Sequence, residues 1–347
     1  MLMTDKMKAW VLTTNGPTAS VFEQRELPVP TPAEDEVLIK VWQFGLNFAD
    51  VMAMLGLYRD CPPLPAVIGY DIGGVVEAVG ASVTTLKVGD TVVGMTRFGG
   101  YAEYAVTKAQ ALTKLPEGLA MEDGVAMITQ GVTAEYMASY QQPVRAGEKV
   151  LVHAAAGGVG GLLVQMAVNA GASVAGTAGS KEKLDKISRL GTSLPINYRS
   201  GDFVSQIESS EEFGKLDVIF DPVGGASVKQ GIKLLRPGGR MVVFGGSSFT
   251  NAKGFFSKLR NFLRFGFYHP MILLGKSISI LGVNMLRIGD HRPEVLAECL
   301  QSVVDKAGRK ELVADVFKVY PAAEFPDAIM ALAERKTTGK VVVSWDS

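Results

Sequence analysis

The sequence predicts an α/β protein in which a mostly β domain is joined to a domain built on a doubly wound parallel sheet. The N-terminal third consists of short β segments separated by Gly, Pro and acidic turn residues, but from about Glu122 strands alternate with helices. Such alternation is typical of βαβ units, whose helices cover both faces of a parallel sheet. A Gly- and Ala-rich turn at residues 154–160, between an apolar strand and a helix, strengthens this interpretation.

Length and composition bound the class of protein. The 347 residues suffice for two ordinary domains, and a hydrophobic content of 47% suffices for their cores. The 35 basic and 35 acidic residues give a net charge of zero, which argues against a nucleic-acid-binding protein that depends on a basic field. Two cysteines exclude a disulfide framework and fit a reducing cytoplasm. The N-terminus lacks the apolar core of a secretory signal, and no apolar run is long enough to span a bilayer.

Strands of the first domain are expected where apolar residues run between turn residues. These strands are Lys8–Leu12, Glu36–Phe44, Gly73–Val79 and Thr91–Gly94. After His291 the chain is predicted to return to this domain. Its returning elements are the helices Pro293–Ala307 and Ala322–Glu334 and the strands Val316–Tyr320 and Lys340–Ser344. We therefore expect one domain from residues 1–128 with 292–347, and a second from residues 129–291.

The second domain is expected to contain the parallel sheet. Its strands are expected at Glu148–His153, Ser173–Thr177, Lys215–Phe220, Arg240–Phe244 and Ser277–Val283. Its helices are expected at Val159–Ala170, Lys181–Leu190 and Gly225–Leu235. Because His153 ends a buried strand, we interpret it as a core histidine and not as a metal ligand.

The first strand of this sheet leads into a turn that suits a dinucleotide. Small residues let the backbone approach a pyrophosphate, and the N-terminus of the following helix supplies N–H donors. The turn residues are Ala155, Ala156, Gly157, Gly158, Val159 and Gly160. Gly157 and Gly160 match the last two glycines of the G-x-G-x-x-G pattern, whereas Ala155 stands at the first. A tight turn without a ligand is the alternative interpretation.

The end of the second strand indicates which dinucleotide binds. NAD sites usually place Asp or Glu there, bonded to the ribose 2′-hydroxyl, but no carboxylate stands at this strand tip. We expect Ser180 to cap the next helix and bond a 2′-phosphate, Lys183 to offset its charge, and Tyr198 with Arg199 to close the pocket. These residues predict NADPH, although Lys183 alone also fits a solvated helix lysine.

Several runs of the chain together resemble the quinone oxidoreductase branch of the medium-chain dehydrogenase/reductase superfamily. They are His153–Gly160, Gly176–Lys183, Ile196–Arg199, Asp221–Gly225 and Val243–Gly245, with Gly45–Asp50, Gly56–Tyr58, Gly69–Val76 and Val88–Val92 in the N-terminal half. Within this branch the sequence is most similar to the synaptic vesicle amine transport protein homologues, through Leu46–Asp50 and an aromatic, basic insertion after Gly245. The resemblance implies a GroES-like domain and a Rossmann domain.

The resemblance also implies an NADPH-binding set that extends beyond the turn. These residues are Asn47, Thr133, Ala155–Gly160, Ser180, Lys183, Tyr198, Phe244 and Gly245. On its own, Thr133 fits an ordinary helix residue equally well. In similar proteins the outer edge of the Rossmann sheet pairs with its twin, which implies a homodimer through Ser277–Val283. A loop covering that edge is the alternative.

Zinc alcohol dehydrogenases of this superfamily have a Cys where Asn47 stands and Gly-His-Glu where Gly69-Tyr70-Asp71 stands. Catalytic zinc needs three ligands from Cys, His and carboxylates, and Asn47 and Tyr70 are poor replacements. We therefore expect no metal, and a zinc-dependent alcohol dehydrogenase is a disfavoured alternative. Without a Lewis acid, a conjugated acceptor is easier to reduce than an isolated ketone, because hydrogen bonds suffice to hold its delocalised anion.

The sequence thus predicts an NADPH-dependent oxidoreductase that transfers hydride to a quinone or an α,β-unsaturated carbonyl. Asn47 and Tyr58 are the candidate catalytic donors near the acceptor oxygen, with the proton coming from Tyr58 or from water. A Tyr58 that only packs against residues 62–65 is the alternative.

An insertion at residues 253–265 supports a second hypothesis. Its apolar residues Phe255, Phe256, Leu259, Phe262 and Leu263 share one face of an amphipathic helix, beside Lys258, Arg260 and Arg264. We expect this apolar face to pack on its own protein. A dimer interface is the second interpretation, and docking on a membrane surface is the third. The corresponding functional alternative is an NADPH-binding adaptor or membrane- or vesicle-associated protein with weak reductase activity.

Overall fold

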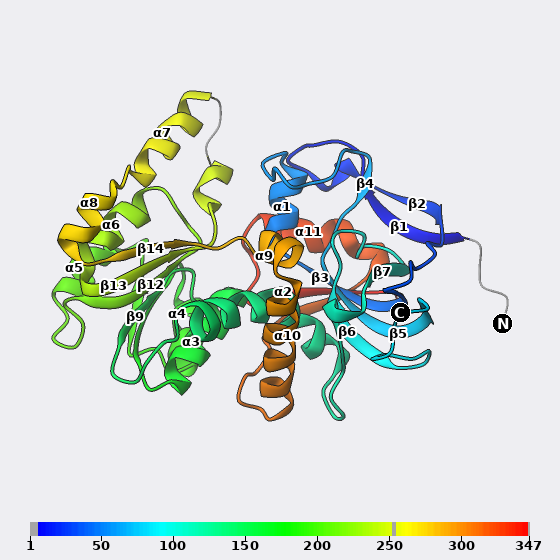
Figure 1. Ribbon diagram of the computed structural model, residues 1–347. Coiled ribbons are helices and arrows are strands. Elements are labelled where there is room, and N and C mark those ends of the chain that lie inside the picture. The colour runs from blue at the N-terminus through cyan, green and yellow to red at the C-terminus, as the bar shows by residue number, and fades with distance from the viewer. Residues whose placement is uncertain (1–5, 252–254, 346–347) are drawn as a thin grey trace. The chain divides into compact units, whose positions relative to one another are not determined.

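The structure is a computed structural model that describes residues 6–251 and 255–345 (Figure 1). The chain forms two compact units. Unit 1 contains the residues up to Thr133 and those from Leu286 onward, and unit 2 runs from Ala134 to Met285. The predicted α/β class is confirmed, because one unit is mostly β and the other is built on a parallel sheet.

Unit 1 is organised around two sheets. Among the described residues, its larger sheet has the strand order β15–β16–β3–β5–β6–β8, with β7 also paired to β3, and its smaller sheet has the order β2–β1–β4. The larger sheet contains β3 (Glu36–Leu46), β5 (Asp71–Val79), β6 (Thr91–Met95), β7 (Tyr104–Lys108), β8 (Leu112–Lys114), β15 (Val316–Pro321) and β16 (Lys340–Ser344). The smaller sheet contains β1 (Lys6–Leu12), β2 (Phe22–Pro28) and β4 (Ala66–Val67). The C-terminal part of the chain joins this sheet, because β16 pairs with β3.

The helices of unit 1 close its core. They are α1 (Phe48–Met54), α9 (Met285–His291), α10 (Pro293–Gly308) and α11 (Phe325–Ala333), and α2 (Met121–Glu135) runs into unit 2, where a π-helical turn, Tyr136–Gln141, follows it. The ring of Phe325 lies 5.0 Å from the ring of Trp10 and 5.2 Å from that of Tyr101. Aromatic rings at such spacings stabilise a core beyond the area that they bury. This packing holds the sheet from which the polar cluster described below is built.

Unit 2 is built on a parallel sheet with the strand order β11–β10–β9–β12–β13–β14 among the described residues. Its strands are β9 (Lys149–Val152), β10 (Ser173–Ala178), β11 (Leu194–Asn197), β12 (Leu216–Asp221), β13 (Leu235–Val243) and β14 (Ser279–Gly282). Its helices include α3 (Gly158–Asn169), α4 (Lys181–Arg189), α5 (Phe203–Glu208) and α6 (Ala226–Leu234). The strand order reverses beside β9, and doubly wound sheets bind ligands at the carboxyl ends of their strands at such a point.

Several predicted boundaries differ from the structure by a few residues, and three of them are instructive. The strand expected from Arg240 begins at Leu235. Its pairing with β12 shifts in register between Leu235 and Arg240. The strand expected from Ser277 begins at Ser279, because Ser277 ends the preceding helix in a left-handed conformation with a φ of 52°. The helix expected from Ala322 begins as a 3-10 turn, and α11 itself begins at Phe325.

The predicted helix of the insertion is present as α7 (Phe255–Phe265), and α8 (Pro270–Lys276) follows it. The helix does pack on its own protein, because the ring of Phe265 stacks on that of Phe249 and the Asn261 amide donates to the Ser248 hydroxyl. The expected apolar face does not make this contact, because its described residues Phe256, Leu259, Phe262 and Leu263 are exposed. Lys253 of the insertion lies outside the described residues. Across residues 6–251 and 255–345, no helix combines the length and the apolarity needed to cross a bilayer.

Candidate functional site

The glycine-rich turn of unit 2 lies between β9 and α3. Ala154 adopts a left-handed conformation with a φ of 52°, and its carbonyl oxygen accepts a 2.9 Å hydrogen bond from the amide of Gly157. A Cβ atom on Gly160 would lie 2.3 Å from the same carbonyl oxygen. Only glycine therefore fits at position 160 without displacing the turn.

This turn has the properties of an anion site. Gly157 is the N-cap of α3, and Gly158, Val159 and Gly160 form its first turn. The first N–H groups of a helix have no intrahelical acceptor, and the helix dipole places positive potential there. The turn follows β9, the strand at which the sheet order reverses, so a pyrophosphate placed there would meet the N–H donors of α3.

The residues predicted for a 2′-phosphate gather at the end of β10. Ser180 is the N-cap of α4, and its hydroxyl accepts a hydrogen bond of 3.4 Å from the amide of Lys183. Tyr198 follows β11, and a Cβ atom on Gly179 would approach the Tyr198 hydroxyl to 2.4 Å. Ser180 and Tyr198 are thus brought together. The side chain of Glu182, the nearest acid in the sequence, is exposed.

Loops at the carboxyl ends of β12 and β13 complete this edge of the sheet. The amide of Phe244 donates to the carbonyl of Asp221 at 3.1 Å, and Gly245 passes so close that a Cβ atom there would lie 2.6 Å from the Pro222 carbonyl oxygen. The buried carboxylate of Asp221 accepts hydrogen bonds from the amides of Val223 and Gly224. These contacts place Phe244 and Gly245 at the strand ends, as expected for backbone that borders a cofactor.

His153, at the end of β9, is the buried core histidine that the sequence predicts. Its Nδ1 lies 3.2 Å from the hydroxyl oxygen of Thr177, and its ring meets the ring of Phe203 edge-on at 4.8 Å. Burial lowers the pKa of this imidazole. The histidine is therefore held neutral in the core of unit 2.

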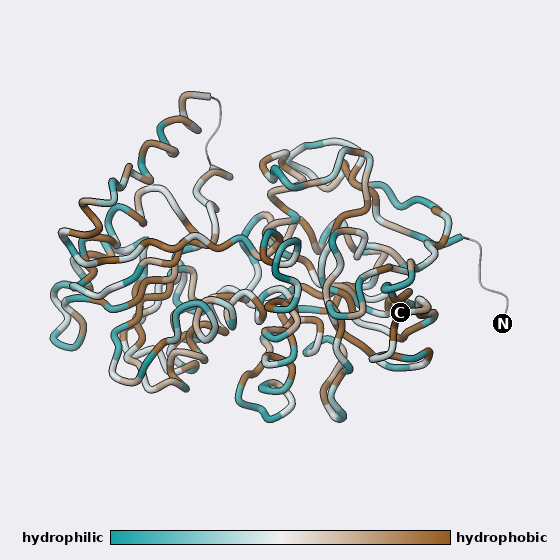
Figure 2. Tube along the Cα trace, viewed as in Figure 1, coloured by the Kyte–Doolittle hydropathy of each residue, from teal (hydrophilic) through white to brown (hydrophobic). Residues whose placement is uncertain are grey.

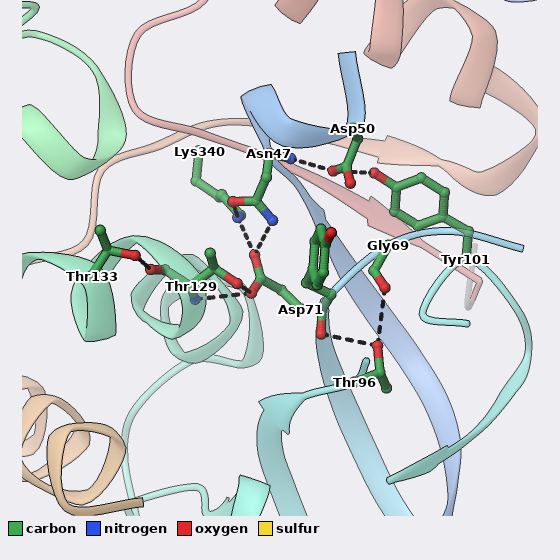
Figure 3. Close-up of polar contacts among 10 residues, drawn as sticks. Asn47, Asp50, Gly69, Asp71, Thr96, Tyr101, Thr129, Thr133 and Lys340 are labelled. Carbon is green, nitrogen blue, oxygen red and sulfur yellow. Dashed lines mark hydrogen bonds and ion pairs between the residues drawn. The ribbon is translucent and has the colours of Figure 1, made fainter. Parts of the chain in front are cut away.

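Unit 1 contains a buried charged cluster around Asn47 (Figure 3). The Lys340 ammonium donates a 2.9 Å hydrogen bond to the Oδ1 atom of Asn47 and forms an ion pair with Asp71. The side-chain nitrogen Nδ2 of Asn47 donates a 2.8 Å hydrogen bond to Oδ2 of Asp71, the oxygen that is paired with Lys340. The side chains of Lys340 and Asp71 are both fully buried. Asn47 is therefore held by a cation on its oxygen and an anion on its nitrogen.

Gly45 makes room for this cluster. A Cβ atom at position 45 would lie 2.4 Å from Cε of Lys340 and 3.1 Å from Cβ of Asp71. Gly45 lies on β3, between the strands β5 and β16 that carry these two residues. The missing side chain thus lets a lysine lie across the centre of the sheet.

The cluster continues into α2. The other oxygen of Asp71 accepts a 2.9 Å hydrogen bond from the amide of Thr129 and a short one from its hydroxyl. The Thr133 hydroxyl donates to the Thr129 carbonyl oxygen at 2.6 Å, one helical turn away. Thr133 is buried, so in this structure its hydroxyl satisfies its own helix.

Asp50 begins α1 and is buried beside this cluster. Its Oδ2 atom accepts hydrogen bonds from the backbone N–H of Asn47 at 2.7 Å and from the Tyr101 hydroxyl at 2.5 Å. Its Oδ1 atom is buried and has no hydrogen-bond partner within the described chain. Burial raises the pKa of Asp50 to about 7, against the lowering effect of these two donors. Asp50 thus caps the start of α1 through the backbone amide of Asn47.

Two tyrosines lie near Asp50. Tyr70 is buried, and its hydroxyl makes no close hydrogen bond within the described chain, although it interacts with the Tyr58 hydroxyl. Burial is the main cause that raises the pKa of Tyr70, and the charges of Tyr58 and Asp50 act in the same direction. Tyr58 is half-buried against the core, and burial raises the pKa of its hydroxyl as well. Tyr58 and Tyr70 therefore both lie within range of the Asp50 charge.

The residues at the zinc-ligand positions do not fit a zinc ion. Asn47 uses its side-chain oxygen for Lys340, and Tyr70 supplies a phenol whose pKa is raised, although a phenolate would be needed as a ligand. The Lys340 ammonium already brings a positive charge to this place. Within residues 6–251 and 255–345, no three His, Cys, Asp or Glu side chains are grouped to hold a metal ion.

Sequence reasoning missed Lys340, Thr129 and Tyr70 as members of the polar cluster, and it treated Asp71 only as part of a run. One signal was available: Lys340 opens the otherwise apolar strand Lys340–Ser344, where a lysine is unusual. The partner of that lysine could not be read from the sequence, because 269 residues separate Lys340 from Asp71.

The fold and the site together define a medium-chain dehydrogenase/reductase. The family model described as alcohol dehydrogenase GroES-like domain matches residues 33–117, and the one described as zinc-binding dehydrogenase matches residues 158–302. The chain belongs to the quinone oxidoreductase branch of this superfamily.

Individual comparisons support this membership. The chain is 32% identical to the synaptic vesicle membrane protein VAT-1 homolog of Danio rerio, over 97% of this chain and 70% of that protein. It is 30% identical to the quinone oxidoreductase of Sus scrofa, over 92% of each chain. The crystal structure of Escherichia coli quinone oxidoreductase complexed with NADPH matches with a TM-score of 0.84 and 27% identity, over 97% of this chain and 99% of that one.

Proposed function

We propose that this protein is an NADPH-dependent oxidoreductase that transfers hydride to a quinone or an α,β-unsaturated carbonyl without zinc. The observation that carries the proposal is the Lys340–Asp71–Asn47 cluster, which fills the place of a metal centre with a hydrogen-bonded lysine. An enzyme with this cluster has no Lewis acid to polarise an isolated ketone. A conjugated acceptor suits it, because hydrogen-bond donors can hold the delocalised anion.

The cofactor is NADPH. The turn at Gly157–Gly160 holds the pyrophosphate through the first N–H groups of α3, and Ser180, Lys183 and Tyr198 hold the 2′-phosphate. Asn47 and Thr133 of unit 1 and the backbone of Phe244 and Gly245 complete the set. The NADPH complex of the E. coli relative supports this choice. When bound, the cofactor supplies hydride.

The acceptor oxygen is held by donors of unit 1. One amide hydrogen of Asn47 is used by Asp71, which leaves the second for the substrate. Tyr58 is the second donor and delivers the proton directly or through water. The Tyr70 hydroxyl, buried beside that of Tyr58, is a third donor that the sequence did not indicate.

Turnover assays test this proposal. Purified protein should oxidise NADPH in the presence of quinones or enones, and prior treatment with a zinc chelator should leave the rate unchanged. Binding of NADPH without turnover across a panel of quinones, enones and enals would contradict the enzyme function and favour the NADPH-binding adaptor. Loss of activity on chelation, restored by zinc, would revive the alcohol dehydrogenase alternative.

The assembly follows from the edge of the sheet in unit 2. In the part of the chain that the structure describes, β14 is the outer strand and pairs with β13 only. An exposed strand edge invites pairing, so two copies form a homodimer through residues 277–283. Light scattering tests this: Ile280→Pro, which removes a backbone N–H donor from the strand, should give a monomer. Cys61 and Cys299 are thiols and not joined in a disulfide in the described chain, which fits a cytoplasmic protein.

A further inference from the structure

The two carboxyl oxygens of Asp50 have unequal surroundings. Its Oδ2 atom accepts two hydrogen bonds, from the backbone N–H of Asn47 and from the Tyr101 hydroxyl, as Figure 3 shows. Its Oδ1 atom is buried and has no close hydrogen-bond partner within the described chain. Because two donors occupy Oδ2, the proton of a neutral Asp50 belongs on Oδ1. This acidic hydrogen is received by neither Asn47 nor Tyr101.

The surroundings of Asp50 favour this neutral form. The residue is only 1% exposed, and the strands of unit 1 carry brown, hydrophobic stretches in Figure 2. Burial is the largest cause of its raised pKa, and the charge of Asp71 acts in the same direction, whereas Lys340 and the two donors lower it. A buried carboxyl group that keeps its proton near neutral pH can serve as an acid.

Most titratable groups that face Asp50 cannot receive this proton. Lys340 and Asp71 are paired with each other, and Tyr101 already donates to Asp50. Cys61 is a half-buried thiol whose pKa is raised by burial and by the Asp50 charge, so it keeps its own proton.

Tyr70 is the exception among these groups. Its hydroxyl is buried, makes no close hydrogen bond in the described chain, and lies within range of the Asp50 charge. Its carbonyl oxygen accepts a 2.7 Å hydrogen bond from the amide of Thr96, and its ring lies 5.1 Å from the ring of Phe98, so the residue is held in place. Buried polar groups are seldom left without partners, and two such groups near each other call for a functional explanation.

Tyr58 connects Tyr70 to the surface of unit 1. Burial raises the pKa of both phenols, and the contact between their hydroxyls raises that of Tyr70 further while it acts against the increase in Tyr58. This difference means that Tyr70 donates toward Tyr58. Tyr58 is half-buried, so an acceptor can reach it although Asp50 and Tyr70 are enclosed.

We propose that Asp50 is the proton reservoir of the reaction and that Tyr70 passes its proton to Tyr58 at the acceptor. These three groups are here called the relay. The inference rests on the proposed function. In the relay Asp50 and Tyr70 act through Tyr58, which is the group that meets the acceptor oxygen.

The relay balances the protons of one turnover. Hydride from NADPH leaves the acceptor as an anion, whose oxygen takes the proton of Tyr58. Tyr58 regains a proton from Tyr70, and Tyr70 regains one from Oδ1 of Asp50, directly or through a water molecule. After the product leaves, the Asp50 carboxylate takes a proton from solvent along the same groups. Each turnover therefore consumes one NADPH and one proton.

The pH dependence of turnover with a quinone tests the relay. In the wild type, kcat should fall as the pH rises through about 7, because Asp50 then loses its acidic hydrogen. Asp50→Asn keeps an oxygen for both donors but has no acidic hydrogen. Its kcat at about pH 6 should be about tenfold lower and should not depend on pH in this range. Its solvent deuterium isotope effect should exceed that of the wild type, because proton transfer then limits the rate.

Two phenol variants form a matched pair. Tyr70→Phe interrupts the relay, so it should reproduce the lower kcat and the larger isotope effect of Asp50→Asn, and the double variant should lose no more. Tyr101→Phe leaves the relay intact and removes a donor that lowers the pKa of Asp50, so the fall in kcat should move to higher pH. NADPH binding by each variant verifies folding.

Infrared spectroscopy adds a readout that needs no turnover. Near neutral pH the wild type should show the C=O stretching band of a protonated carboxyl group that Asp50→Asn lacks. This band should shift in Tyr70→Phe, because the relay joins the two side chains. An unshifted band would overturn the relay.

The kinetic outcomes separate the relay from the function on which it rests. A wild type that reduces no quinone or enone would overturn both. A wild type that turns over with the pH profile of Asp50→Asn would overturn the relay alone. So would a Tyr70→Phe variant that loses rate but keeps the pH dependence, because Tyr70 would then donate to the acceptor without Asp50.

Discussion

The Lys340 ammonium and the Asp71 carboxylate form an ion pair in the centre of unit 1, and neither side chain reaches solvent. Each charge was removed from water at a cost of several kcal/mol, which good geometry and further hydrogen bonds must offset. Here Asn47 and Thr129 provide those hydrogen bonds. The pair thus fixes the orientation of Asn47, whose remaining amide hydrogen is the proposed contact with the acceptor.

Replacing Lys340 with Met should strongly destabilise unit 1. Asp71 would be left as an unpaired buried charge, which costs about 3–5 kcal/mol. Trp10, Trp42 and Trp345 all belong to unit 1, so tryptophan fluorescence in a urea titration reports its unfolding selectively.

The double variant Lys340→Met, Asp71→Asn serves as its control. Because it removes both charges, it should recover part of the lost unfolding free energy. If Lys340→Met unfolds at the same urea concentration as the wild type, the ion pair does not hold this part of unit 1 together.

Asp50 makes the stability of unit 1 depend on pH. Its pKa is raised from 3.8 to about 7 in the folded protein, so the folded state retains a proton that the unfolded chain releases within this range. Its contribution to stability is therefore fully present below about pH 4 and is lost as the pH rises to about 7. The variant Asp50→Asn should lack this dependence. Urea titrations from pH 4 to 8 measure the free energy of unfolding of both proteins. The difference between the variant and the wild type should change by up to about 4 kcal/mol over this range. Parallel curves for the two proteins would refute the raised pKa.

Gly160 and Gly161 offer a matched pair for the cofactor turn. A Cβ atom on Gly160 would collide with the Ala154 carbonyl oxygen, whereas the nearest atom to a Cβ on Gly161 is 3.6 Å away. Gly160→Ala should therefore weaken NADPH binding at least about tenfold, through a shift of the turn worth roughly 1.4 kcal/mol or more. Gly161→Ala should bind as the wild type does. Fluorescence titration with NADPH measures both, and equal affinities for the two variants would remove the turn from the site.

Lys183 tests the choice between the two dinucleotides. Lys183→Ala should weaken NADPH about tenfold but leave NADH nearly unchanged, since a charge-assisted hydrogen bond to a 2′-phosphate is worth roughly 1.5–3 kcal/mol. Isothermal titration with each dinucleotide measures this difference. Lys181→Ala, a change of an exposed lysine two positions earlier, is the control. Equal losses of affinity for NADPH and NADH would show that Lys183 does not contact the 2′-phosphate.

The variant Tyr70→Phe tests whether Tyr70 donates a hydrogen bond to the substrate or only supports the fold. Its hydroxyl makes no close hydrogen bond in the described chain, so Tyr70→Phe should change the unfolding free energy little. If the hydroxyl holds the acceptor oxygen, kcat/KM should fall about tenfold in the same variant. Tyr101→Phe gives the opposite pattern on stability, because it removes a donor from Asp50. Unchanged kinetics in Tyr70→Phe would exclude its proposed role.

Local patterns predicted the parts of the site that lie close together along the chain. The turn from Ala155 to Gly160 and the cap at Ser180 each depend on a few consecutive residues, so their chemistry could be predicted from the sequence. The exposure of the apolar face of α7 could not be predicted in this way. A helical pattern shows that a face is apolar, and only the position of Phe265 and Asn261 on their neighbours shows which face is covered.

The sequence by itself determined the two-part α/β architecture and the dinucleotide turn, because strand and helix periodicity and glycine placement act over short distances. Tertiary structure alone decided that Lys340 meets Asp71 and Asn47. Those residues lie on β16, on β5 and after β3, and pairing in one sheet brings them together. Contacts between distant parts of a chain depend on strand register and on the space that a residue such as Gly45 leaves. Neither property can be predicted from a single segment of the sequence.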